Sequence, residues 1–292
     1  MSPREAVTPD MDVATAPHVT VAEEVLSAPP VVRIRPCETP EDYAACVDLQ
    51  SRTWGAGYRD VVTPSLLKVS GRIGGVVAGA YLGTGEMVGF VFGLTGLRDG
   101  KLVHWSHMLA VDGAYRDRGV GRRLKEHQRE VLRDLGVETA CWTFDPLVAR
   151  NAHLNLNRLS ASLEEYVTDM YADTGSGLHA FGTDRLVVSW PVAGDRKPLA
   201  PDAMDGTAPV VNVDPDGTMR CDPMDVRAAQ VRIEIPAEIE PLVDSDAGLL
   251  RQWRVSTRAA FRMYLSRGFG LRGFQRGAER GWYVLEAEPG GT

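Results

Sequence analysis

Five basic side chains surround two glycines in and directly after residues 107–124, HMLAVDGAYRDRGVGRRL. The glycines are Gly119 and Gly121, and the basic residues are Arg116, Arg118, Arg122, Arg123 and Lys125. An apolar run precedes the group and helically spaced apolar residues follow it, so the pattern predicts a strand, a turn and a helix start. The first amides of a helix lack intrahelical partners and carry the positive end of its dipole, so such a turn can bind a pyrophosphate. The alternative is a solvated basic helix start with an ordinary turn.

Two histidines precede this turn on the predicted strand. Strand alternation places His104 on one face, together with Ser106 and Met108, and His107 on the other. The two histidines are therefore not expected to share one site.

Residues 142–161, WTFDPLVARNAHLNLNRLSA, place polar side chains on one side of a predicted helix. Asn151, Asn155 and Arg158 share a helical sector, while Leu154 and Leu159 are expected to face the core. Asparagines directed from a helix into a gap between strands can bind amide groups or a carbonyl oxygen. The alternative is that Asn151 caps the helix and the other polar side chains are solvated.

The elements that position these residues follow from periodicity and turn chemistry. Runs rich in β-formers predict strands at 31–36, 76–82, 87–94, 102–111, 138–144 and 183–191. Start signals and helical spacing predict helices at 39–54, 63–73 and 120–135. The segment 192–228 is rich in Pro, Gly and Asp, and Asp216 with Gly217 predicts a hairpin within it. Beyond it we expect a strand at 231–236, a helix at 244–266, and strands at 270–275 and 282–286.

The overall composition limits the class of protein. The chain has 292 residues, 44% of them hydrophobic and 24% charged, with a net charge of −7, which argues against nucleic acid or an anionic membrane as its main partner. Residues 1–30 hold one cation, five acids and no Phe, Trp or Tyr, which predicts a disordered acidic tail. The four cysteines are scattered, which favours reduced thiols over a zinc site. With neither a signal-peptide pattern nor a membrane-spanning apolar run, a cytoplasmic protein is expected.

The glycine motif resembles the acyl-CoA binding motif of the GNAT family of N-acyltransferases. In that family R/Q-x-x-G-x-G/A follows a strand, and here Arg116-x-x-Gly119-x-Gly121 follows HMLAV. The predicted order of elements over residues 31–192 is also similar to the family's order. A Walker loop is excluded because no Gly-Lys-Ser/Thr follows, and a Rossmann fingerprint is disfavoured because a meander precedes the motif. The resemblance implies an α/β (α+β) fold with a mixed, mostly antiparallel sheet flanked by helices.

The resemblance implies a site for acyl-CoA. The CoA pyrophosphate is expected on the amides of residues 116–122, and the pantetheine arm beside the backbone of residues 109–111. Residues 142–161 also resemble a poorly characterised GNAT branch that includes amino-acid N-succinyltransferases. The implied acyl donor is therefore acetyl-CoA or succinyl-CoA, with no metal. The implied cofactor-binding residues are Leu109, Ala110, Val111, Arg116, Arg118, Gly119, Val120, Gly121, Arg122, Asn151 and Asn155.

GNAT enzymes are expected to transfer the acyl group by direct attack of an amine on the thioester, which requires a proton acceptor and a proton donor. The spacing of His107 is similar to that of one of two histidines in arylalkylamine N-acetyltransferases, whose second histidine falls on Trp105. The family's usual tyrosine, in A-x-x-x-Y-x-x-x-G-F, falls on Leu156. The tail matches this pattern with AFRMYLSRGF, so Tyr264 is a catalytic candidate. Structural roles for His107 and Tyr264 are the alternatives, and Tyr166 is another possible proton source.

The order strand, helix, strand, strand occurs twice, at 138–191 and at 229–287. The tail is therefore expected to repeat the closing half of the GNAT core. The expected units are an acidic tail at 1–30, a GNAT core at 31–192, a linker at 193–228 and a C-terminal half-unit at 229–288.

The expected function is acyl-CoA-dependent acylation of a small-molecule amine, with an amino acid favoured. An amino acid needs a cation for its carboxylate, and the candidates are Arg59, Arg150 and Arg158, with Arg185 as a further one. The alternative is a CoA-binding sensor or structural partner that has lost catalysis, which the displaced tyrosine and the half-matched histidine pair favour. Neither nucleic acid nor a membrane is an expected partner, and a homodimer is left open.

Overall fold

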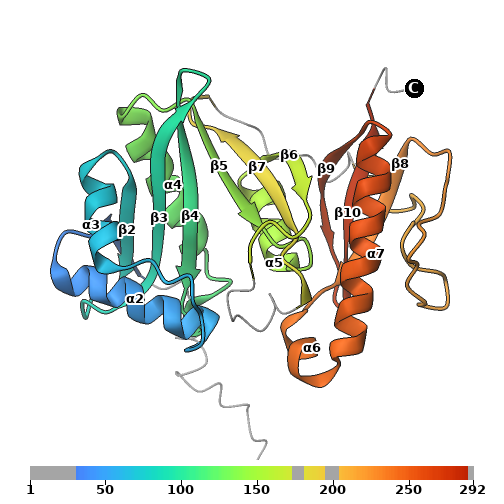
Figure 1. Ribbon diagram of the computed structural model, residues 1–292, viewed down its shortest axis with the longest axis horizontal. Coiled ribbons are helices and arrows are strands. Elements are labelled where there is room, and N and C mark those ends of the chain that lie inside the picture. Colours follow the sequence, from blue (N-terminus) through green and yellow to red (C-terminus); the bar gives the residue numbers. More distant parts are fainter. Residues whose placement is uncertain (1–30, 173–180, 195–203, 289–292) are drawn as a thin grey trace, which may run out of the picture.

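The computed structural model describes residues 31–172, 181–194 and 204–288, which form two β-sheets with helices packed against them (Figure 1). The strands of the larger sheet are β1 (Arg33–Pro36), β2 (Val76–Tyr81), β3 (Met87–Arg98), β4 (Lys101–Val111), β5 (Thr139–Phe144), β6 (Ser162–Val167) and β7 (Arg185–Pro191). The helices of this part are α2 (Pro40–Trp54), α3 (Pro64–Arg72), η1 (Gly113–Tyr115), α4 (Val120–Asp134), α5 (Ala149–Ala152) and the π-helical η2 (His153–Arg158). The smaller sheet contains β8 (Gln230–Pro236), β9 (Phe269–Arg276) and β10 (Arg280–Ala287), with helices α6 (Glu240–Ser245) and α7 (Ala247–Ser266). The predicted acidic tail at 1–30 and part of the predicted linker lie outside the described residues.

The larger sheet has the strand order β1-β2-β3-β4-β5-β7-β6, and the smaller sheet has the order β8-β10-β9. Neighbouring strands are antiparallel except for β4 and β5, which run parallel. The sheet is therefore mixed and mostly antiparallel, which confirms the fold class expected from the sequence.

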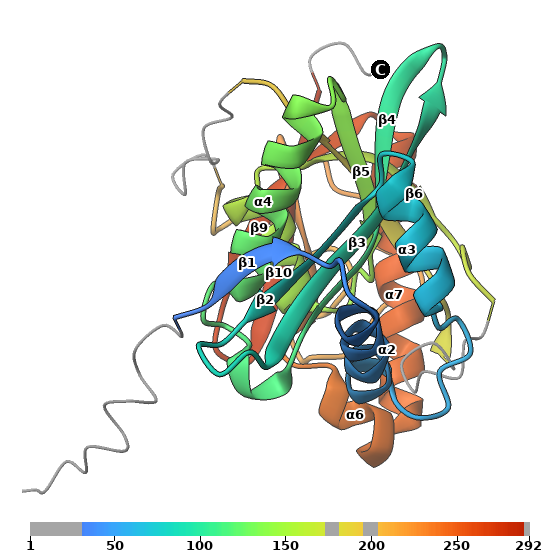
Figure 2. The same cartoon turned by 90° about the vertical axis from the view of Figure 1, so that its left-hand side faces the viewer.

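Helix α2 begins with the chemistry that its sequence predicts. The Thr39 hydroxyl accepts a hydrogen bond from the Asp42 amide, and the Asp42 carboxylate accepts one from the Thr39 amide, both at 3.2 Å. This reciprocal pair is a capping box, and Pro40 occupies the first turn. Helices α2 and α3 cover one face of the larger sheet and α4 covers the other (Figure 2).

Strands β4 and β5 separate part-way along their length. β4 is paired with β3 as far as Val111, but it is paired with β5 only from Val103 to Trp105. Beyond Trp105, one edge of β4 has no strand partner among the described residues. An unpaired strand edge presents free backbone N–H and C=O groups.

A β-bulge interrupts β4 at His107. Ser106 pairs with Gly93 and Met108 pairs with the adjacent Phe92, so His107 is the extra residue. The bulge changes the alternation of side chains, because Ser106 contacts Lys125 of α4 while Met108 packs in the core under α2. The prediction that Ser106 and Met108 share a face is therefore wrong.

The C-terminal part has the same strand topology as the end of the larger sheet. In each, the chain runs strand, helix, strand, strand, and the last strand lies between the other two in antiparallel pairing. The single helix predicted at 244–266 is two helices, because Asp246 caps α7 by accepting a hydrogen bond from the Leu249 amide at 2.8 Å. The turn predicted at Asp216 and Gly217 is confirmed by the Asp214–Thr218 backbone hydrogen bond of 2.8 Å.

Hydrogen bonds and ion pairs join the two sheets. The Asn157 side chain hydrogen-bonds both backbone groups of Phe274 in β9, at 2.6 and 3.1 Å. The Tyr283 hydroxyl of β10 donates to the Pro146 carbonyl at 2.7 Å. Arg254 of α7 donates two hydrogen bonds to the Asp145 carboxylate, at 2.8 and 2.9 Å, and both side chains are buried. The C-terminal unit therefore holds the turn that follows β5.

We predict that Arg254→Ala lowers the free energy of unfolding by about 3–5 kcal/mol, because it leaves the Asp145 carboxylate buried without its bidentate partner. Lys101→Ala is the control, since the Lys101–Glu138 pair is exposed and contributes less than about 1 kcal/mol. Urea unfolding of both variants measures the difference. If Arg254→Ala lowers the free energy of unfolding by less than about 1 kcal/mol, the buried Arg254–Asp145 pair does not stabilise the junction of the two sheets.

Candidate active site

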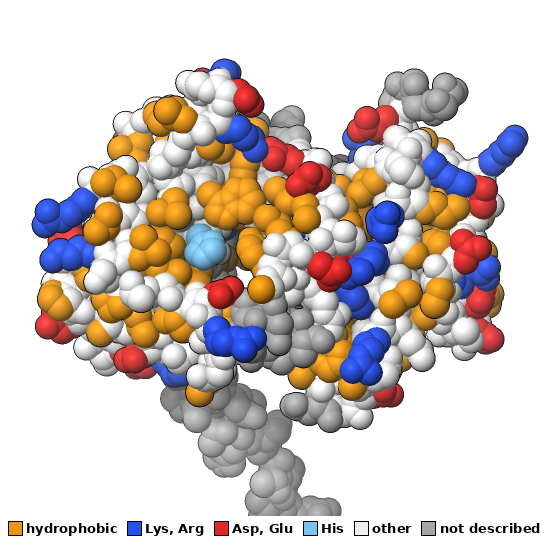
Figure 3. Space-filling view, in the orientation of Figure 1, with side chains coloured by type: hydrophobic (Ala, Val, Ile, Leu, Met, Phe, Trp, Pro, Cys, Tyr) orange, Lys and Arg blue, Asp and Glu red, His pale blue; other side chains and the backbone are white. Residues whose placement is uncertain are grey.

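Two adjoining cavities lie where β4 and β5 separate. The first, about 530 Å³, is lined by the end of β4, the 115–119 loop, the start of α4, and α5. The second, about 450 Å³, lies between β4 and β5 and extends to β7. In Figure 3 this face of the molecule is hollowed near its centre, with hydrophobic side chains and a histidine around the hollow. The cavities share Thr53, Trp54, Leu109, Arg116, Arg150, Asn151 and Leu154, so they form one continuous space.

The first cavity is built around the N-terminus of α4. Gly119 ends the preceding loop with a left-handed φ of 77°, and no side chain caps the helix. Gly119, Val120, Gly121 and Arg122 line the cavity, and the first turn contains no acidic residue. Free amides and the positive end of the helix dipole therefore favour an anion here.

Packing against neighbouring residues does not require a glycine at position 121. A Cβ at this position would lie 3.7 Å from Leu109 and Val111 side-chain atoms and 3.8 Å from Leu154, which is ordinary contact. Glycine in a helix is about 1 kcal/mol less favourable than alanine. The fold alone therefore does not explain a glycine at this position.

The basic cluster divides between several environments. Arg116 and Arg122 line the first cavity, whereas Arg118 lines neither cavity, so the structure does not bring Arg118 together with the other predicted cofactor residues. Lys125 lines the second cavity instead. The predicted backbone segment Leu109, Ala110 and Val111 lines the first cavity, which also contains Arg150, Arg158 and Arg276.

The two histidines of β4 have different surroundings. His104 is fully buried and hydrogen-bonds Thr95 at 2.9 Å and Gln128 at 3.0 Å, so it is structural. Burial, together with the Lys125 ammonium, lowers the pKa of His104 to about 3. His107 lines the second cavity, with its ring 5.9 Å from that of Phe92. The His107 side chain is exposed in the cavity, and desolvation by the surrounding protein lowers its pKa while Asp60 acts in the opposite direction, so the neutral imidazole is favoured.

The structure corrects the prediction that Tyr264 is catalytic. Tyr264 is 0% exposed, and its hydroxyl donates to the Met224 carbonyl at 2.5 Å. It lines neither cavity, because α7 packs it into the core of the C-terminal unit. Tyr166 is also unsuitable, since its hydroxyl donates to Asp184 at 2.5 Å and it lines a separate cavity of about 770 Å³ between β6 and β9. Leu156, in the family's tyrosine position, is buried in the core.

Two other tyrosines line the second cavity. Tyr58 stacks on Trp54 with ring centroids 5.3 Å apart, and burial raises its pKa to about 12. Tyr171 lies with its hydroxyl 3.4 Å from the Thr143 hydroxyl of β5. Tyr171 belongs to an irregular segment, so no periodic pattern in the sequence could have placed it here.

The polar helix predicted after β5 consists of the four-residue α5, which continues as the π-helical η2. Asn151 lines both cavities, and Asn155 lines the second while accepting a hydrogen bond from Trp142 Nε1 at 3.0 Å. Leu159 is buried as expected, but Leu154 lines both cavities as well as contacting the core. A π-helical turn contains more residues than an α-helical turn, which shifts the face that each side chain occupies.

The predicted substrate-binding arginines do not all reach the cavities. Arg59 is exposed and lines neither, although its neighbours Tyr58 and Asp60 line the second. Arg158 lines the first cavity, and Arg150 lines both and pairs with Glu240.

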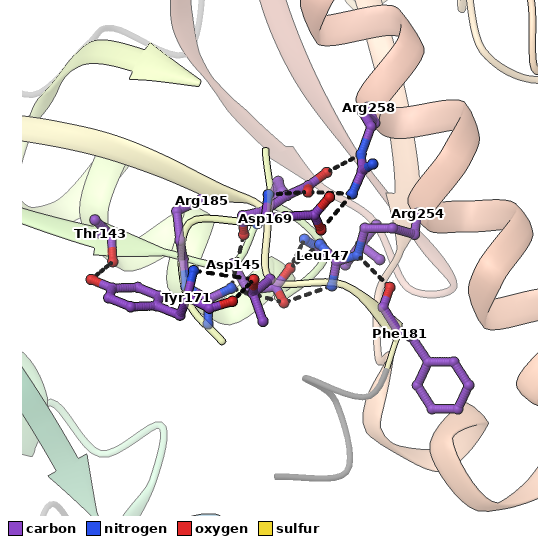
Figure 4. Close-up of polar contacts among 12 residues, drawn as sticks. Thr143, Asp145, Leu147, Asp169, Tyr171, Phe181, Arg185, Arg254 and Arg258 are labelled. Atoms are coloured by element: carbon purple, nitrogen blue, oxygen red, sulfur yellow. Dashed lines mark hydrogen bonds and ion pairs between the residues drawn. The ribbon is translucent and has the colours of Figure 1, made fainter. Parts of the chain in front are cut away.

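Arg185, the further candidate, is buried at the β7 end of the second cavity. Its guanidinium lies 3.5 Å from an Asp145 oxygen and 5.4 Å from the centre of the Tyr171 ring. Arg254 of α7 holds the same Asp145 from the opposite side (Figure 4). Burial lowers the pKa of Arg185, and Asp145 opposes that effect.

Several lining residues had no signal in the sequence. Glu240 of α6 reaches the second cavity and Arg276 of β9 reaches the first. Both come from the C-terminal unit, more than eighty residues after the glycine motif, and only the packing of the two sheets brings them there. Lys125 was recognised only as one member of the basic cluster.

Within the described part of the chain, no helix is long and apolar enough to cross a membrane. The same residues contain no group of three or more His, Cys, Asp or Glu side chains arranged to hold a metal ion.

Comparison with known proteins finds a family match for the central segment. Residues 43–154 match the model of the acetyltransferase (GNAT) family. This segment contains β2 to β5, the glycine motif and α4. The central segment is therefore similar to the GNAT family, and the mixed, mostly antiparallel sheet flanked by helices matches the GNAT fold, with further strands in a C-terminal extension. No curated protein matches the chain.

Three solved structures illustrate what this chain is similar to. The ribosomal-protein-S18-alanine N-acetyltransferase from Escherichia coli is 19% identical, with 58% of this chain and 99% of that chain covered and a TM-score of 0.44. The yncA protein from Salmonella typhimurium, solved with its cofactor acetyl-CoA, is 17% identical, with 57% and 97% covered and a TM-score of 0.44. The NatC complex bound to Gag peptide and CoA is 16% identical, with 56% and 99% covered and a TM-score of 0.44.

We predict that His107 titrates with a midpoint below 6.5 and that Asp60→Asn moves this midpoint further down. Partial desolvation by the surrounding protein disfavours the imidazolium, and removing the Asp60 charge removes an interaction that favours it. NMR titration of the imidazole nitrogens measures both midpoints. An upward shift in Asp60→Asn would contradict the proposed environment of His107.

Proposed function

We propose that this protein is an acyl-CoA-dependent N-acyltransferase that transfers an acetyl or succinyl group to the amine of a small molecule, an amino acid being the favoured acceptor. The observation that carries this proposal is the continuous pair of cavities. A helix N-terminus that favours anions leads along the free edge of β4 into a cavity that contains a neutral histidine. The GNAT family match of residues 43–154 supports the same reaction class.

The first cavity has the features that CoA requires. The amides of Gly119 to Arg122, with Arg116 nearby, would hold the pyrophosphate, and the missing side chain at Gly121 leaves room for it. The free edge of β4 at residues 109–111 would hydrogen-bond the amides of the pantetheine arm, beside Asn151.

Thr53 provides an independent indication of a ligand where the two cavities join. Its Oγ1 is buried and has no hydrogen-bond partner among the described residues, and the residue lines both cavities. Buried polar atoms are nearly always paired in folded proteins. An amide or carbonyl group of the pantetheine arm would supply the missing partner.

His107 is the proposed proton acceptor of the reaction. The amine must lose a proton to attack the thioester carbonyl, and a neutral imidazole that lines the cavity can accept that proton. The bulge in β4 directs His107 out of the regular alternation and into this cavity. The C–N bond then forms, the C–S bond breaks, and the thiolate of CoA leaves.

The charges of the second cavity suit a zwitterionic acceptor. Asp60 and Glu240 would attract an ammonium group, while Arg150 and Arg185 would attract a carboxylate. The same arginines also support succinyl-CoA as the alternative to acetyl-CoA, because a succinyl group carries a carboxylate. The identity of the amino-acid acceptor and the identity of the acyl donor can therefore be determined independently in the same assay.

The proposed function is tested by measuring the release of CoA thiol from acetyl-CoA and from succinyl-CoA, each with a panel of amino acids. We expect release that depends on the amino acid, with the N-acylated product identified by mass spectrometry. CoA binding without transfer to any amine would contradict an enzymatic role and support a sensor.

We predict that Gly121→Glu abolishes CoA binding, because it places a carboxylate beside the pyrophosphate position at the start of α4. Gly121→Gln is the matched variant with similar size and no charge, and Gly121→Ala has a Cβ that the surrounding contacts tolerate. We expect CoA affinity to decrease in the order Ala, Gln, Glu. Calorimetric titration measures the affinities, and unchanged affinity in folded Gly121→Glu would rule out the helix start as the phosphate site.

A further inference from the structure

Lys125 occupies the point at which β4 and β5 separate. The last paired residues of the two strands are Trp105 and Cys141, and Lys125 contacts the residue that follows each of them. Its Nζ donates to Ser106 Oγ at 2.7 Å and lies 3.7 Å from the centre of the Trp142 ring. Lys125, Ser106 and Trp142 all line the second cavity, and Lys125 is 2% exposed.

The environment of Lys125 is unusual for a lysine. The residue is 2% exposed, and no carboxylate lies within ion-pair distance of Nζ in residues 31–172, 181–194 and 204–288. Its contacts are a hydroxyl, the amide oxygen of Gln128 at 3.4 Å and an aromatic ring. Lysine is rarely fully buried unless it is paired. Burial lowers the pKa of the Lys125 ammonium well below its ordinary value, so this group can release a proton more readily than an exposed lysine.

The proposed path of CoA ends beside this group. Val111, which lines the first cavity, is five positions after Ser106, which lines the second. At about 3.3 Å per residue, this part of β4 spans roughly 16 Å. A pantetheine arm that follows the free edge of β4 from the phosphate site is therefore directed toward His107 and then Ser106.

The reaction also lacks a proton donor in the family's usual position. The buried side chain of Leu156 stands there, and both Tyr264 and Tyr166 have hydrogen-bond partners outside the two cavities. Tyr58 lines the second cavity, but burial raises its pKa to about 12, which makes it a weaker acid than an ordinary tyrosine.

We propose that Ser106 and Lys125 act together to protonate the departing thiolate of CoA. This inference rests on the proposed acyltransferase function. As the C–S bond breaks, the sulfur takes the hydroxyl proton of Ser106, and Ser106 takes a proton from the Lys125 ammonium. The acceptor amine gives its own proton to His107, and exchange with solvent returns the imidazolium to neutral and Lys125 to the ammonium form. Protons and charge therefore balance over one turnover.

The test is the pH profile of kcat in the full-length chain, for wild type, Lys125→Met, Lys125→Arg and Ser106→Ala. In the wild type, kcat should fall as the pH rises through the lowered Lys125 pKa, because the ammonium form is lost. Lys125→Met should lower kcat by about 10²-fold or more and lose this alkaline limb. Lys125→Arg keeps the charge but cannot release a proton, so it should be similarly slow.

Several other groups contribute to the profile and must be assigned. An acidic limb is expected from His107 and from the acceptor ammonium, and it should persist in all Lys125 variants. The other titratable or charged groups that face Lys125 or share its cavity are His104, Asp60, Arg116, Asp145, Arg150, Arg185, Glu240, Tyr58 and Tyr171.

Matched controls separate this role from stability. Lys101→Met removes an exposed lysine that lines neither cavity, and it should leave the profile unchanged. Thermal unfolding and CoA affinity should be near wild type in folded Lys125→Met. Where that variant does not fold, Ser106→Ala carries the test, with an expected loss of at least tenfold in kcat and little change in CoA affinity.

The outcomes distinguish this inference from the proposed function. A wild type that neither binds CoA nor transfers an acyl group overturns the proposed function, and the inference with it. An active wild type whose alkaline limb survives in Lys125→Met, or whose kcat stays within threefold of wild type in Ser106→Ala, overturns only the inference. Wild-type kcat in Lys125→Arg also overturns it, because charge alone would then suffice.

Discussion

A buried ion pair between Arg254 and Asp145 connects the two sheets at the point where the second cavity is formed. Asp145 begins the turn after β5, accepts a hydrogen bond from the Leu147 amide at 2.8 Å, and lies between Arg254 on one side and Arg185 on the other. Two buried arginines would repel one another without that carboxylate. The orientation of the helix that bears Arg150, Asn151 and Asn155 depends on this turn, so a residue of α7 determines one wall of the cavity.

The second constraint is the separation of β4 from β5. Parallel strands normally continue their ladder, yet here the pairing stops after Trp105, and the bulge at His107 follows two residues later. The free strand edge results from this interruption, and His107 and Lys125 both line the cavity that it leaves. Closing the ladder would satisfy the backbone of β4 but would eliminate the cavity.

Local chemistry was sufficient to predict much of the fold. The capping box at Thr39, the glycine at 119 with its left-handed φ, and the period of α4 each act within a few residues, so the sequence contains the relevant interaction. The bulge at His107 could not be predicted, because it depends on register with β3, and the π-helical η2 depends on packing against β9. For the same reason Tyr264 was misplaced. Its motif specifies a helix that ends in Gly-Phe, but not which side of the sheet that helix will cover.

The C-terminal unit shares the topology of β5 to β7 but, among its described residues, contains no strand equivalent to β4 and no glycine turn before a helix. It contributes Glu240 to the second cavity and Arg276 to the first, but no residue to the helix start at residues 119–122. Natural variation at α6 can therefore alter the wall of one cavity while leaving the anion-binding turn intact. Under the proposed function, this modular arrangement allows selectivity for one reactant to diverge between related proteins while affinity for the other is inherited unchanged.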